Sequence, residues 1–101
     1  MVTYDVIVIG AGAAGLMFAG QLCSNLSCLI IESNKSPGRK IQISGGGRCN
    51  FTNLDVSPSH FLSKNEHFSK SALSRYTQWD FIDLVANKNI AYYEKKLGQL
   101  F

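Results

Sequence analysis

The sequence has no paired cysteines and no metal-binding cluster. Its three cysteines, Cys23, Cys28 and Cys49, are an odd number and show no C-x-x-C spacing. This pattern excludes a disulfide framework and a cysteine-based zinc site, and it is typical of a reducing compartment. His60 and His67 have no further metal-ligand side chains at a useful spacing. We therefore expect no metal site, and we expect Cys23 and Cys28 to lie in the core.

A membrane-spanning run and an export signal are also missing. The uncharged stretch from Val6 to Gly20 is shorter than the roughly 20 apolar residues that a membrane helix needs, and glycines interrupt it. Asp5 stands immediately before it, and no basic segment precedes it. We expect a cytoplasmic protein without a membrane partner.

The composition indicates a globular chain with little net charge. Hydrophobic residues make up 46% of the sequence, charged residues 17%, and the formal net charge is +3. This mild positive charge fits an anionic cofactor and equally an ordinary surface, so it does not decide about nucleic acid. The 101 residues make at most one domain, and they hold no recognisable nucleophile–base set for hydrolysis.

A glycine-rich turn between an apolar strand and a helix organises the chain. Tyr4–Ile9 predicts a first strand, Ala13–Ser24 a helix and Cys28–Ile31 a second strand. The first strand is apolar nearly throughout, as expected of a parallel strand that is covered on both faces. Together the three segments predict a βαβ unit with a right-handed crossover.

Three glycines, Gly10, Gly12 and Gly15, shape the turn. We expect Gly10 to permit the sharp bend, Gly12 to let a pyrophosphate approach the backbone and Gly15 to let the helix pack closely on the strand. Ala13 and Ala14 begin the helix, whose N–H groups and dipole attract phosphates. The alternative is a tight turn in an unrelated α/β domain. The flanking strand and helix favour a dinucleotide site.

Glu32 ends the second predicted strand, 17 residues after Gly15. A carboxylate at this position accepts hydrogen bonds from an adenosine ribose. The 2′-phosphate of NADP would meet like charge there, so NADP is disfavoured. The alternative is an exposed glutamate at the end of a strand.

The polar, glycine-rich stretch Ser33–Asn53 predicts a long loop. Arg39, Lys40 and Arg48 flank the glycine triplet at 45–47. Guanidinium groups and glycine N–H groups together suit a pyrophosphate or the edge of a flavin ring. A solvated basic loop and a nucleic-acid patch are equally compatible with these residues.

The second half of the sequence predicts two helices. A short one runs from Phe68 to Tyr76, and the other follows a capping sequence at Thr77–Asp80 and reaches about Asn87. Tyr76, Trp79 and Phe81 follow the helical period, which predicts core positions.

A hairpin is predicted at the end of the sequence, between Ile90–Tyr93 and Gly98–Phe101, with its turn near Leu97 and Gly98. Only two segments qualify as parallel strands, whereas a doubly wound sheet needs a third beside the second and others beyond the first. We therefore expect the N-terminal part of something larger.

Residues 38–53, GRKIQISGGGRCNFTN, resemble the signature GRKxxxSGGGRCNxTN of the BaiN-like FAD-dependent oxidoreductases, a family of bacterial flavoproteins. The segments ALSRYTQWDFIDLV and LGQLF resemble the continuation of that family, so the resemblance spans the chain. These proteins are similar in FAD-domain architecture to enzymes of the glutathione reductase type. The resemblance implies an α/β fold in which residues 1–101 are the N-terminal portion of a Rossmann-like FAD-binding domain. The sheet would be incomplete, and a substrate domain would be absent.

The resemblance also implies FAD as the cofactor and assigns residues to it. The pyrophosphate would lie at the first corner, and the ribose at Glu32; the corner residues are Gly10, Gly12, Ala13, Ala14 and Gly15. A second set would follow the pyrophosphate toward the isoalloxazine: Arg39, Lys40, Ser44, Gly45, Gly46, Gly47, Arg48, Cys49 and Asn50.

The leading hypothesis is thus the FAD-binding segment of a flavin-dependent oxidoreductase. One alternative is the nucleotide-binding segment of an NAD-dependent dehydrogenase. Another is a non-catalytic nucleotide- or RNA-binding module that uses Arg39, Lys40 and Arg48. Amine oxidation, reduction of a carbon–carbon double bond and reduction of a base in RNA all stay open as reactions.

Overall fold

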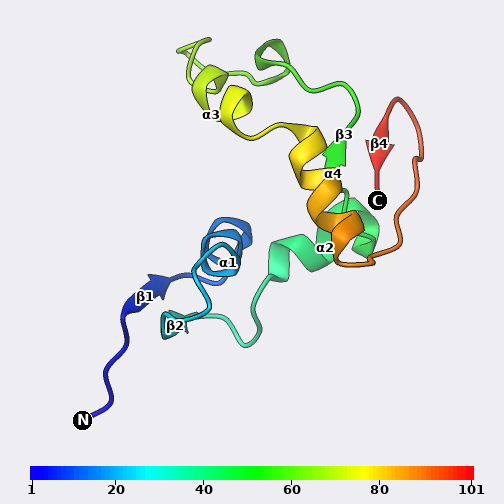
Figure 1. Ribbon diagram of the computed structural model, residues 1–101. Helices are drawn as coiled ribbons and strands as arrows, with labels where there is room; N and C mark the ends of the chain where they lie inside the picture. The colour runs from blue at the N-terminus through cyan, green and yellow to red at the C-terminus, as the bar shows by residue number, and fades with distance from the viewer. The chain divides into compact units, whose positions relative to one another are not determined.

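Short strands and helices alternate along residues 1–101, all of which the computed structural model describes (Figure 1). The chain divides into two units, Met1–Cys49 (unit 1) and Asn50–Phe101 (unit 2). None of its helices combines the length and the apolar content that crossing a bilayer requires.

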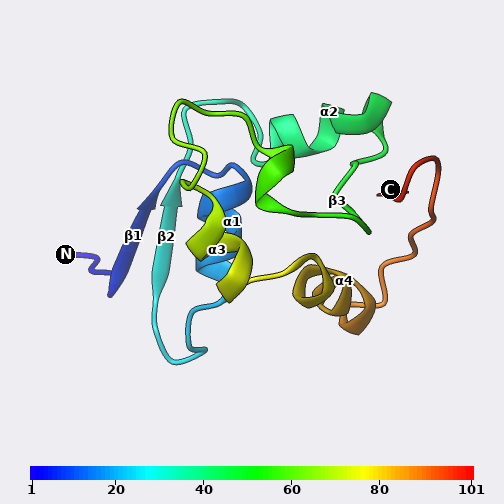
Figure 2. The same ribbon diagram turned by 90° about the horizontal axis from the view of Figure 1, so that it is seen from above.

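Unit 1 begins with the predicted βαβ arrangement. The strands β1 (Val6–Ile9) and β2 (Cys28–Ile31) pair in parallel, and α1 (Ala13–Gly20) connects them. The register sets Val6 opposite Cys28 and Ile9 opposite Ile31. Figure 2 shows the two strands side by side, with α1 next to them. The prediction of a parallel βαβ unit is confirmed.

The ends of these elements differ from the prediction. β1 starts at Val6 rather than Tyr4, because the Asp5 carboxylate accepts hydrogen bonds from the Ser27 N–H at 2.8 Å and from its hydroxyl at 2.7 Å. α1 ends at Gly20 rather than Ser24, since glycine is a poor helix former. Cys23 is consequently exposed, so its predicted core position is wrong, whereas Cys28 is half-buried.

Only one face of β1 is covered in unit 1. Val8 and Ala11 are buried, with exposed fractions of 9% and 3%, while Ile7 and Ile9 are 56% and 79% exposed. Successive side chains of a strand point to opposite faces, and α1 covers only one of them. The prediction that the strand is covered on both faces is therefore wrong for this chain.

The segment predicted as a long loop contains a helix, so that prediction is wrong. α2 (Arg39–Gly47) follows Gly38, which adopts a left-handed conformation with φ of 65°. Three of its first four residues, Arg39, Lys40 and Gln42, are strong helix formers, and the Gln42 N–H donates to the Gly38 carbonyl at 2.9 Å. The backbone leaves helical geometry at Ser44, where ψ is 148°, and Gly45 and Gly46 follow with positive φ.

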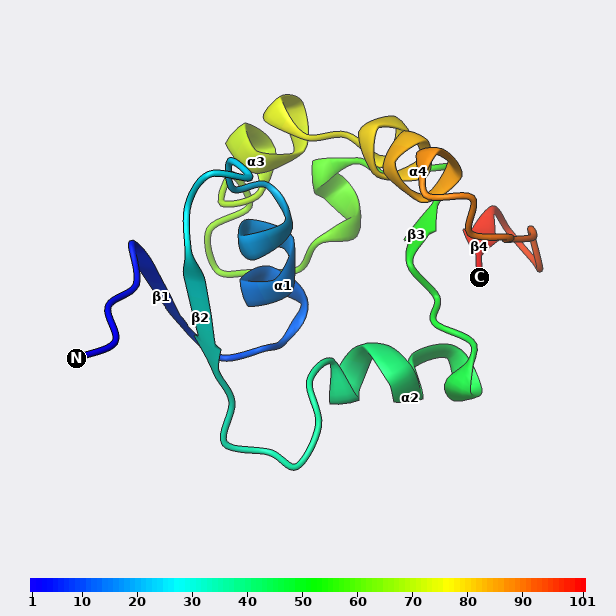
Figure 3. The same ribbon diagram turned by 60° about the horizontal axis from the view of Figure 1, so that its bottom comes forward.

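Unit 2 contains two of the predicted helices and a short helical turn (Figure 3). The 3₁₀ turn η1 spans Pro58–His60, α3 spans Lys70–Arg75 and α4 spans Gln78–Asn87. The capping box before α4 is confirmed. The Thr77 N–H donates to Asp80 Oδ2 at 2.7 Å, and the Asp80 N–H donates to Thr77 Oγ1 at 3.3 Å.

The packed side of α4 is narrower than the sequence predicts. Val85 is buried and Phe81 is half-buried, and α4 packs on the strand β3 (Thr52–Asn53). Trp79 and Tyr76, in contrast, are 55% and 43% exposed. Their predicted core positions are wrong, because they lie near the start of α4, away from the side that holds Val85.

The chain reverses near Leu97 and Gly98 as predicted, but Ile90–Tyr93 is not a strand, and the two arms share only an isolated bridge between Glu94 and Leu100. Tyr93 and Phe101 exchange backbone hydrogen bonds of 3.0 Å, and the turn has positive φ at Leu97 (49°) and Gly98 (78°). The strand β4 (Gln99–Leu100) also pairs antiparallel with β3. Sequence reasoning missed this pairing, because a two-residue strand leaves no periodic pattern.

Candidate dinucleotide site

The turn after β1 is fixed by the neighbouring strand. The Gly10 N–H donates to the Ile31 carbonyl at 2.7 Å, and Gly10 has a φ of 98°. L residues with a side chain rarely adopt this conformation, so glycine is required here. The chain is thereby directed from the strand edge into α1.

The N-terminus of α1 leaves room for an anion. Gly12 is the residue before the helix, no side chain caps this end, and the first turn holds no acidic residue. A Cβ at Gly12 would meet no atom within 4 Å. The N–H groups of a first helical turn have no partner inside the helix, and the helix dipole favours negative charge beside them. Exposed residues Gly12, Ala13 and Ala14 therefore fit the pyrophosphate of a dinucleotide.

Gly15 lets α1 approach β1. A Cβ at this position would overlap the carbonyl oxygen of Gly10 and would lie 3.2 Å from Val8 Cγ1. The third glycine of the turn is therefore needed for close helix–strand packing, as the sequence predicts.

Glu32 lies at the turn, with its carboxylate held by backbone groups. Its Oε2 accepts a hydrogen bond from the Ala11 N–H at 2.7 Å, and its Oε1 accepts from Asn34 N at 3.1 Å and Asn34 Nδ2 at 3.0 Å. The N–H groups of Asn34 and Ala11 hold the pKa of the carboxyl below its ordinary value. An ionised carboxylate has no proton to donate, so this group can act toward a ligand hydroxyl only as an acceptor.

Ala11 joins three segments of unit 1. Its N–H donates to Glu32, and its carbonyl accepts from the Gly38 N–H at 2.7 Å. A Cβ at Gly38 would stand 3.5 Å from Leu16 Cδ1, so the start of α2 also lies against α1. Through Ala11 the glycine turn, the end of β2 and the start of the basic helix are brought together.

The basic residues of α2 are exposed. Arg39 and Lys40 lie in its first turn and form no ion pair, and no acidic residue occurs between Arg39 and Asn50. Arg48, which follows α2, is also exposed. Such a segment is attractive to an anion.

The glycine triplet forms a left-handed bend. Gly45, Gly46 and Gly47 have φ values of 60°, 72° and 87°. The half-buried Ser44 fixes the start of this bend: its hydroxyl donates to the Ile41 carbonyl at 2.8 Å, and its own carbonyl accepts from the Cys49 N–H at 3.0 Å. Cys49 also has a positive φ, 53°, and is half-buried.

Asn50 belongs to unit 2, where its side chain binds backbone carbonyls. In the orientation that satisfies its hydrogen bonds, the amide nitrogen donates to Leu100 O at 3.0 Å and to Thr52 O at 3.2 Å. The Asn53 amide likewise donates to Leu97 O at 3.1 Å. Both amide nitrogens therefore hold residues 97–100 against residues 50–53.

The structure thus brings the glycine corner and Glu32 together within unit 1. Sequence reasoning missed Ala11, Asn34 and Gly38, which connect them. The Pro37-Gly38 pair was a signal for a turn, but nothing in the sequence indicated that the Gly38 N–H reaches Ala11. No group of three or more His, Cys, Asp and Glu side chains is arranged to hold a metal ion.

The model of one protein family, described as the HI0933-like protein Rossmann domain, matches residues 4–101. This match confirms the Rossmann-like α/β class that the sequence predicts.

Several curated proteins are similar to this chain. A ribosomal RNA dihydrouridine synthase of Haemophilus influenzae is 62% identical over 96 residues, which cover 94% of this chain and 24% of that protein. A protein of the same name from Escherichia coli is 60% identical over 103 residues, which cover 100% of this chain and 26% of that protein. A 3-dehydro-bile acid delta(4,6)-reductase of Clostridium scindens is 26% identical over 83 residues, which cover 79% of this chain and 20% of that protein. The chain spans about a quarter of the length of the first two relatives.

Proposed function

The chain belongs to the HI0933-like Rossmann domain family, and from that premise we propose that it binds FAD as part of a flavin-dependent oxidoreductase. The observation that carries this proposal is the open, uncapped N-terminus of α1 at Gly12, with the Glu32 carboxylate beside the same turn. Residues 1–101 would form the N-terminal portion of the FAD-binding domain.

The glycine corner would hold the pyrophosphate. Gly12 offers backbone without a side chain, and the N–H groups of Ala13, Ala14 and Gly15 belong to the first turn of α1. These groups and the helix dipole would neutralise part of the phosphate charge. Gly10 and Gly15 would act indirectly, by setting the bend and the packing of the helix.

Glu32 would accept a hydrogen bond from the adenosine ribose. Its place beside the glycine turn supports this role, and its depressed pKa keeps it ionised, and thus an acceptor, at neutral pH. The same negative charge would repel a 2′-phosphate, so this site favours FAD or NAD over NADP.

The second set of residues would continue along the cofactor. Arg39, Lys40 and Arg48 would supply positive charge to the pyrophosphate, and Ser44, Cys49 and Asn50 would lie toward the isoalloxazine. The glycines at 45–47 would let the ring edge approach the backbone, since they carry no side chains and lie exposed.

We further propose reduction of a uridine base in ribosomal RNA as the reaction, because the two relatives at 60–62% identity are named for that product. Dihydrouridine differs from uridine by two hydrogens across one carbon–carbon double bond. FAD, when bound and reduced by a two-electron donor, supplies a hydride to one of these carbons, and a proton completes the other. This chain's residues would bind and orient the cofactor, and such an RNA substrate favours the cytoplasm as its location.

The test is the absorbance spectrum of the protein expressed from its complete gene. We expect a yellow protein with a flavin band at about 450 nm, and we expect Gly12→Val to abolish the band. Because Gly12 has a φ of −84° and open space around it, the variant should keep the unfolding midpoint of the cofactor-free protein. A colourless wild-type protein that binds NAD would overturn the FAD assignment in favour of a dehydrogenase.

A non-catalytic RNA-binding module is the second candidate, favoured by the exposed cations of α2 and the missing acidic residues there. It predicts RNA affinity that falls steeply with salt in a protein without flavin. Flavin retention together with salt-insensitive RNA binding would exclude this candidate.

A further inference from the structure

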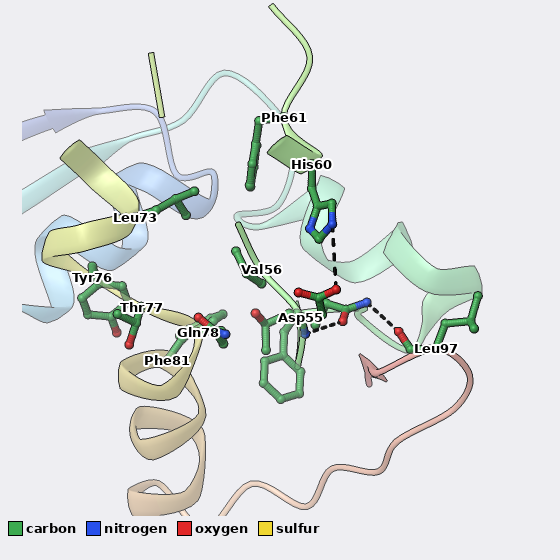
Figure 4. A pocket seen from close by; sticks show the side chains of 13 residues that line it. Asp55, Val56, His60, Phe61, Leu73, Tyr76, Thr77, Gln78, Phe81 and Leu97 are labelled. Atoms are coloured by element: carbon green, nitrogen blue, oxygen red, sulfur yellow. Dashed lines mark hydrogen bonds and ion pairs between the residues drawn. The ribbon is translucent and has the colours of Figure 1, made fainter. Parts of the chain in front are cut away.

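A cavity of about 610 Å³ lies entirely within unit 2 (Figure 4). Its walls come from the segment 51–61, from the end of α3 and the start of α4, and from Leu97. None of these residues is among those proposed to bind FAD, but Phe51 directly follows Asn50, which is proposed to lie toward the isoalloxazine. The cavity therefore borders, in sequence, the segment proposed for the flavin ring.

Aromatic rings form much of the cavity wall. Phe51 is held in place by edge-on contacts with Phe81 and Tyr92, each with ring centroids 5.6 Å apart. Phe61 and Tyr76 line the same space but stay 41% and 43% exposed. Figure 4 shows their side chains on different sides of the cavity. A packed aromatic ring and two more exposed rings lining the same space can contact the faces or edges of a flat, uncharged ligand.

Some polar groups of the cavity are already used by the protein. Asn53 donates to the Leu97 carbonyl and accepts from the Asp55 N–H at 2.8 Å, and the Thr77 hydroxyl is engaged with Asp80. These side chains stabilise the walls and have little capacity left for a ligand.

The Asp55 carboxylate and the His60 imidazole also line the cavity, with Asp55 Oδ2 and His60 Nε2 3.9 Å apart. Three further polar groups of the lining residues have no protein partner. Gln78 uses its amide nitrogen to bind the Leu54 carbonyl at 3.1 Å, which leaves its Oε1 as an acceptor. The hydroxyls of Thr52 and Tyr76 make no hydrogen bond within the protein. The Gln78 oxygen can accept a hydrogen bond from a ligand N–H, and each hydroxyl can donate one to a ligand carbonyl. This set suits a ring that presents one N–H between two carbonyl oxygens.

We propose that this cavity receives a single uracil base extruded from RNA. Uracil has that pattern of one N–H between two carbonyls, and single unstacked bases are read by aromatic stacking and by hydrogen bonds to their edges. This inference rests on the proposed function, since it names where the RNA substrate would be recognised.

The charge of the neighbouring segment is consistent with an RNA chain. Between residues 61 and 76, which border the cavity at both ends, the sequence has Lys64, Lys70 and Arg75 against one carboxylate, Glu66. Cations beside a base pocket attract the phosphates on either side of the extruded nucleotide.

The experiment measures binding of a ten-nucleotide single-stranded RNA with one central uridine to the flavin-loaded protein, by fluorescence anisotropy. Tyr76→Ala removes one open ring and should weaken binding by about tenfold or more. Trp79→Ala removes another exposed aromatic residue, one that does not line the cavity, and it should leave affinity unchanged. Tyr76→Phe keeps the ring, so it should bind nearly as well as wild type while losing preference for uridine over cytidine.

Phe61→Ala gives an independent variant in case Tyr76→Ala disturbs α3, and it should show the same loss. Flavin absorbance and the unfolding midpoint of each variant report whether the protein is intact. Equal affinities for wild type, Tyr76→Ala and Phe61→Ala would overturn the inference while leaving RNA binding established. A flavin-loaded wild-type protein that binds no RNA would overturn the proposed substrate as well.

A steroid is the competing occupant of an aromatic cavity of this size, and a keto bile acid is its probe. Steroid binding that Tyr76→Ala abolishes, combined with unchanged RNA binding, would overturn the uracil assignment.

Discussion

The carbonyl oxygen of Gly10 occupies the space that a Cβ of residue 15 would need. Gly15→Ala should therefore destabilise the protein by about 2 kcal/mol, in the range of overpacking substitutions. Gly20→Ala is the matched control, because Gly20 lies in the same helix and a Cβ there would meet nothing within 4 Å. It should stabilise by about 0.5–1 kcal/mol through helix propensity. Urea unfolding measures the change in the free energy of unfolding for both variants, which should be a loss for Gly15→Ala and a gain for Gly20→Ala. A loss in both would contradict the packing argument.

The turn at Leu97 and Gly98 offers a second pair of opposite effects. Gly98 has a φ of 78°, and a Cβ there would lie 2.6 Å from Asn53 Oδ1, so Gly98→Ala should destabilise by about 1–2 kcal/mol. Leu97 has a φ of 49° and is 94% exposed. Leu97→Asn should stabilise by up to about 1 kcal/mol, because asparagine tolerates this conformation better. Thermal unfolding measures both, and a destabilised Leu97→Asn variant would show that the Leu97 side chain contributes packing.

Glu32 tests the ribose assignment through two substitutions. Glu32→Ala removes both the ligand acceptor and the anchor of Ala11, so FAD affinity should fall by about tenfold or more. Glu32→Gln keeps one acceptor oxygen, so its FAD affinity should lie between those of wild type and Glu32→Ala. Titration of each apoprotein with FAD measures the three affinities. Unchanged affinity in Glu32→Ala would reject the assignment.

The depressed pKa of Glu32 has a consequence for the pH dependence of FAD binding. The carboxyl stays ionised below its ordinary pKa of 4.5, because Asn34 and Ala11 N–H groups favour the charged form. FAD affinity should therefore be constant from pH 8 to about pH 5 as far as Glu32 is concerned. A fall centred near pH 6 would indicate another titrating group.

The capping box of α4 should make stability fall in acid. The Thr77 N–H and hydroxyl hold the pKa of Asp80 below its ordinary value of 3.8. The folded protein therefore releases the proton more readily than the unfolded chain does. The contribution is fully present above pH 3.8 and is lost as the pH falls through the lower folded pKa.

Asp80→Asn should remove this contribution, so its unfolding midpoint should depend less on pH below 4 than that of wild type. Asp83→Asn is the control on the same helix, since the exposed Asp83 side chain makes no hydrogen bond. If both variants flatten the acid profile equally, general charge repulsion is responsible rather than the cap.

The features that the sequence predicted well have strong local signals. The apolar runs before Gly10 and Glu32 predicted two parallel strands, and the Thr77–Asp80 spacing predicted the capping box. In each case the signal lies in neighbouring residues. The consecutive residues GRKIQISGGGRCNFTN likewise predicted a family with a Rossmann-like domain, and the HI0933-like family match over residues 4–101 confirms that domain, while the narrower BaiN-like label is only weakly supported.

The features that were missed depend on residues far apart in the chain. The Ala11 peptide is fixed by Glu32 and Gly38, and the β3–β4 pairing joins Thr52 to Leu100. Neither relationship has a periodic pattern. The helix at Arg39–Ile43 was missed for a different reason, because five helix-forming residues were hidden between Gly38 and the glycine triplet.

The hydrogen bond from the Asn53 amide to the Leu97 carbonyl spans 44 positions of the sequence. On a ribosome, residues 50–54 therefore emerge well before their partners at residues 97–100, whereas the pairing partner of β1 is complete as soon as residue 31 has been added. The β3–β4 pairing can form only after Leu100 has been added.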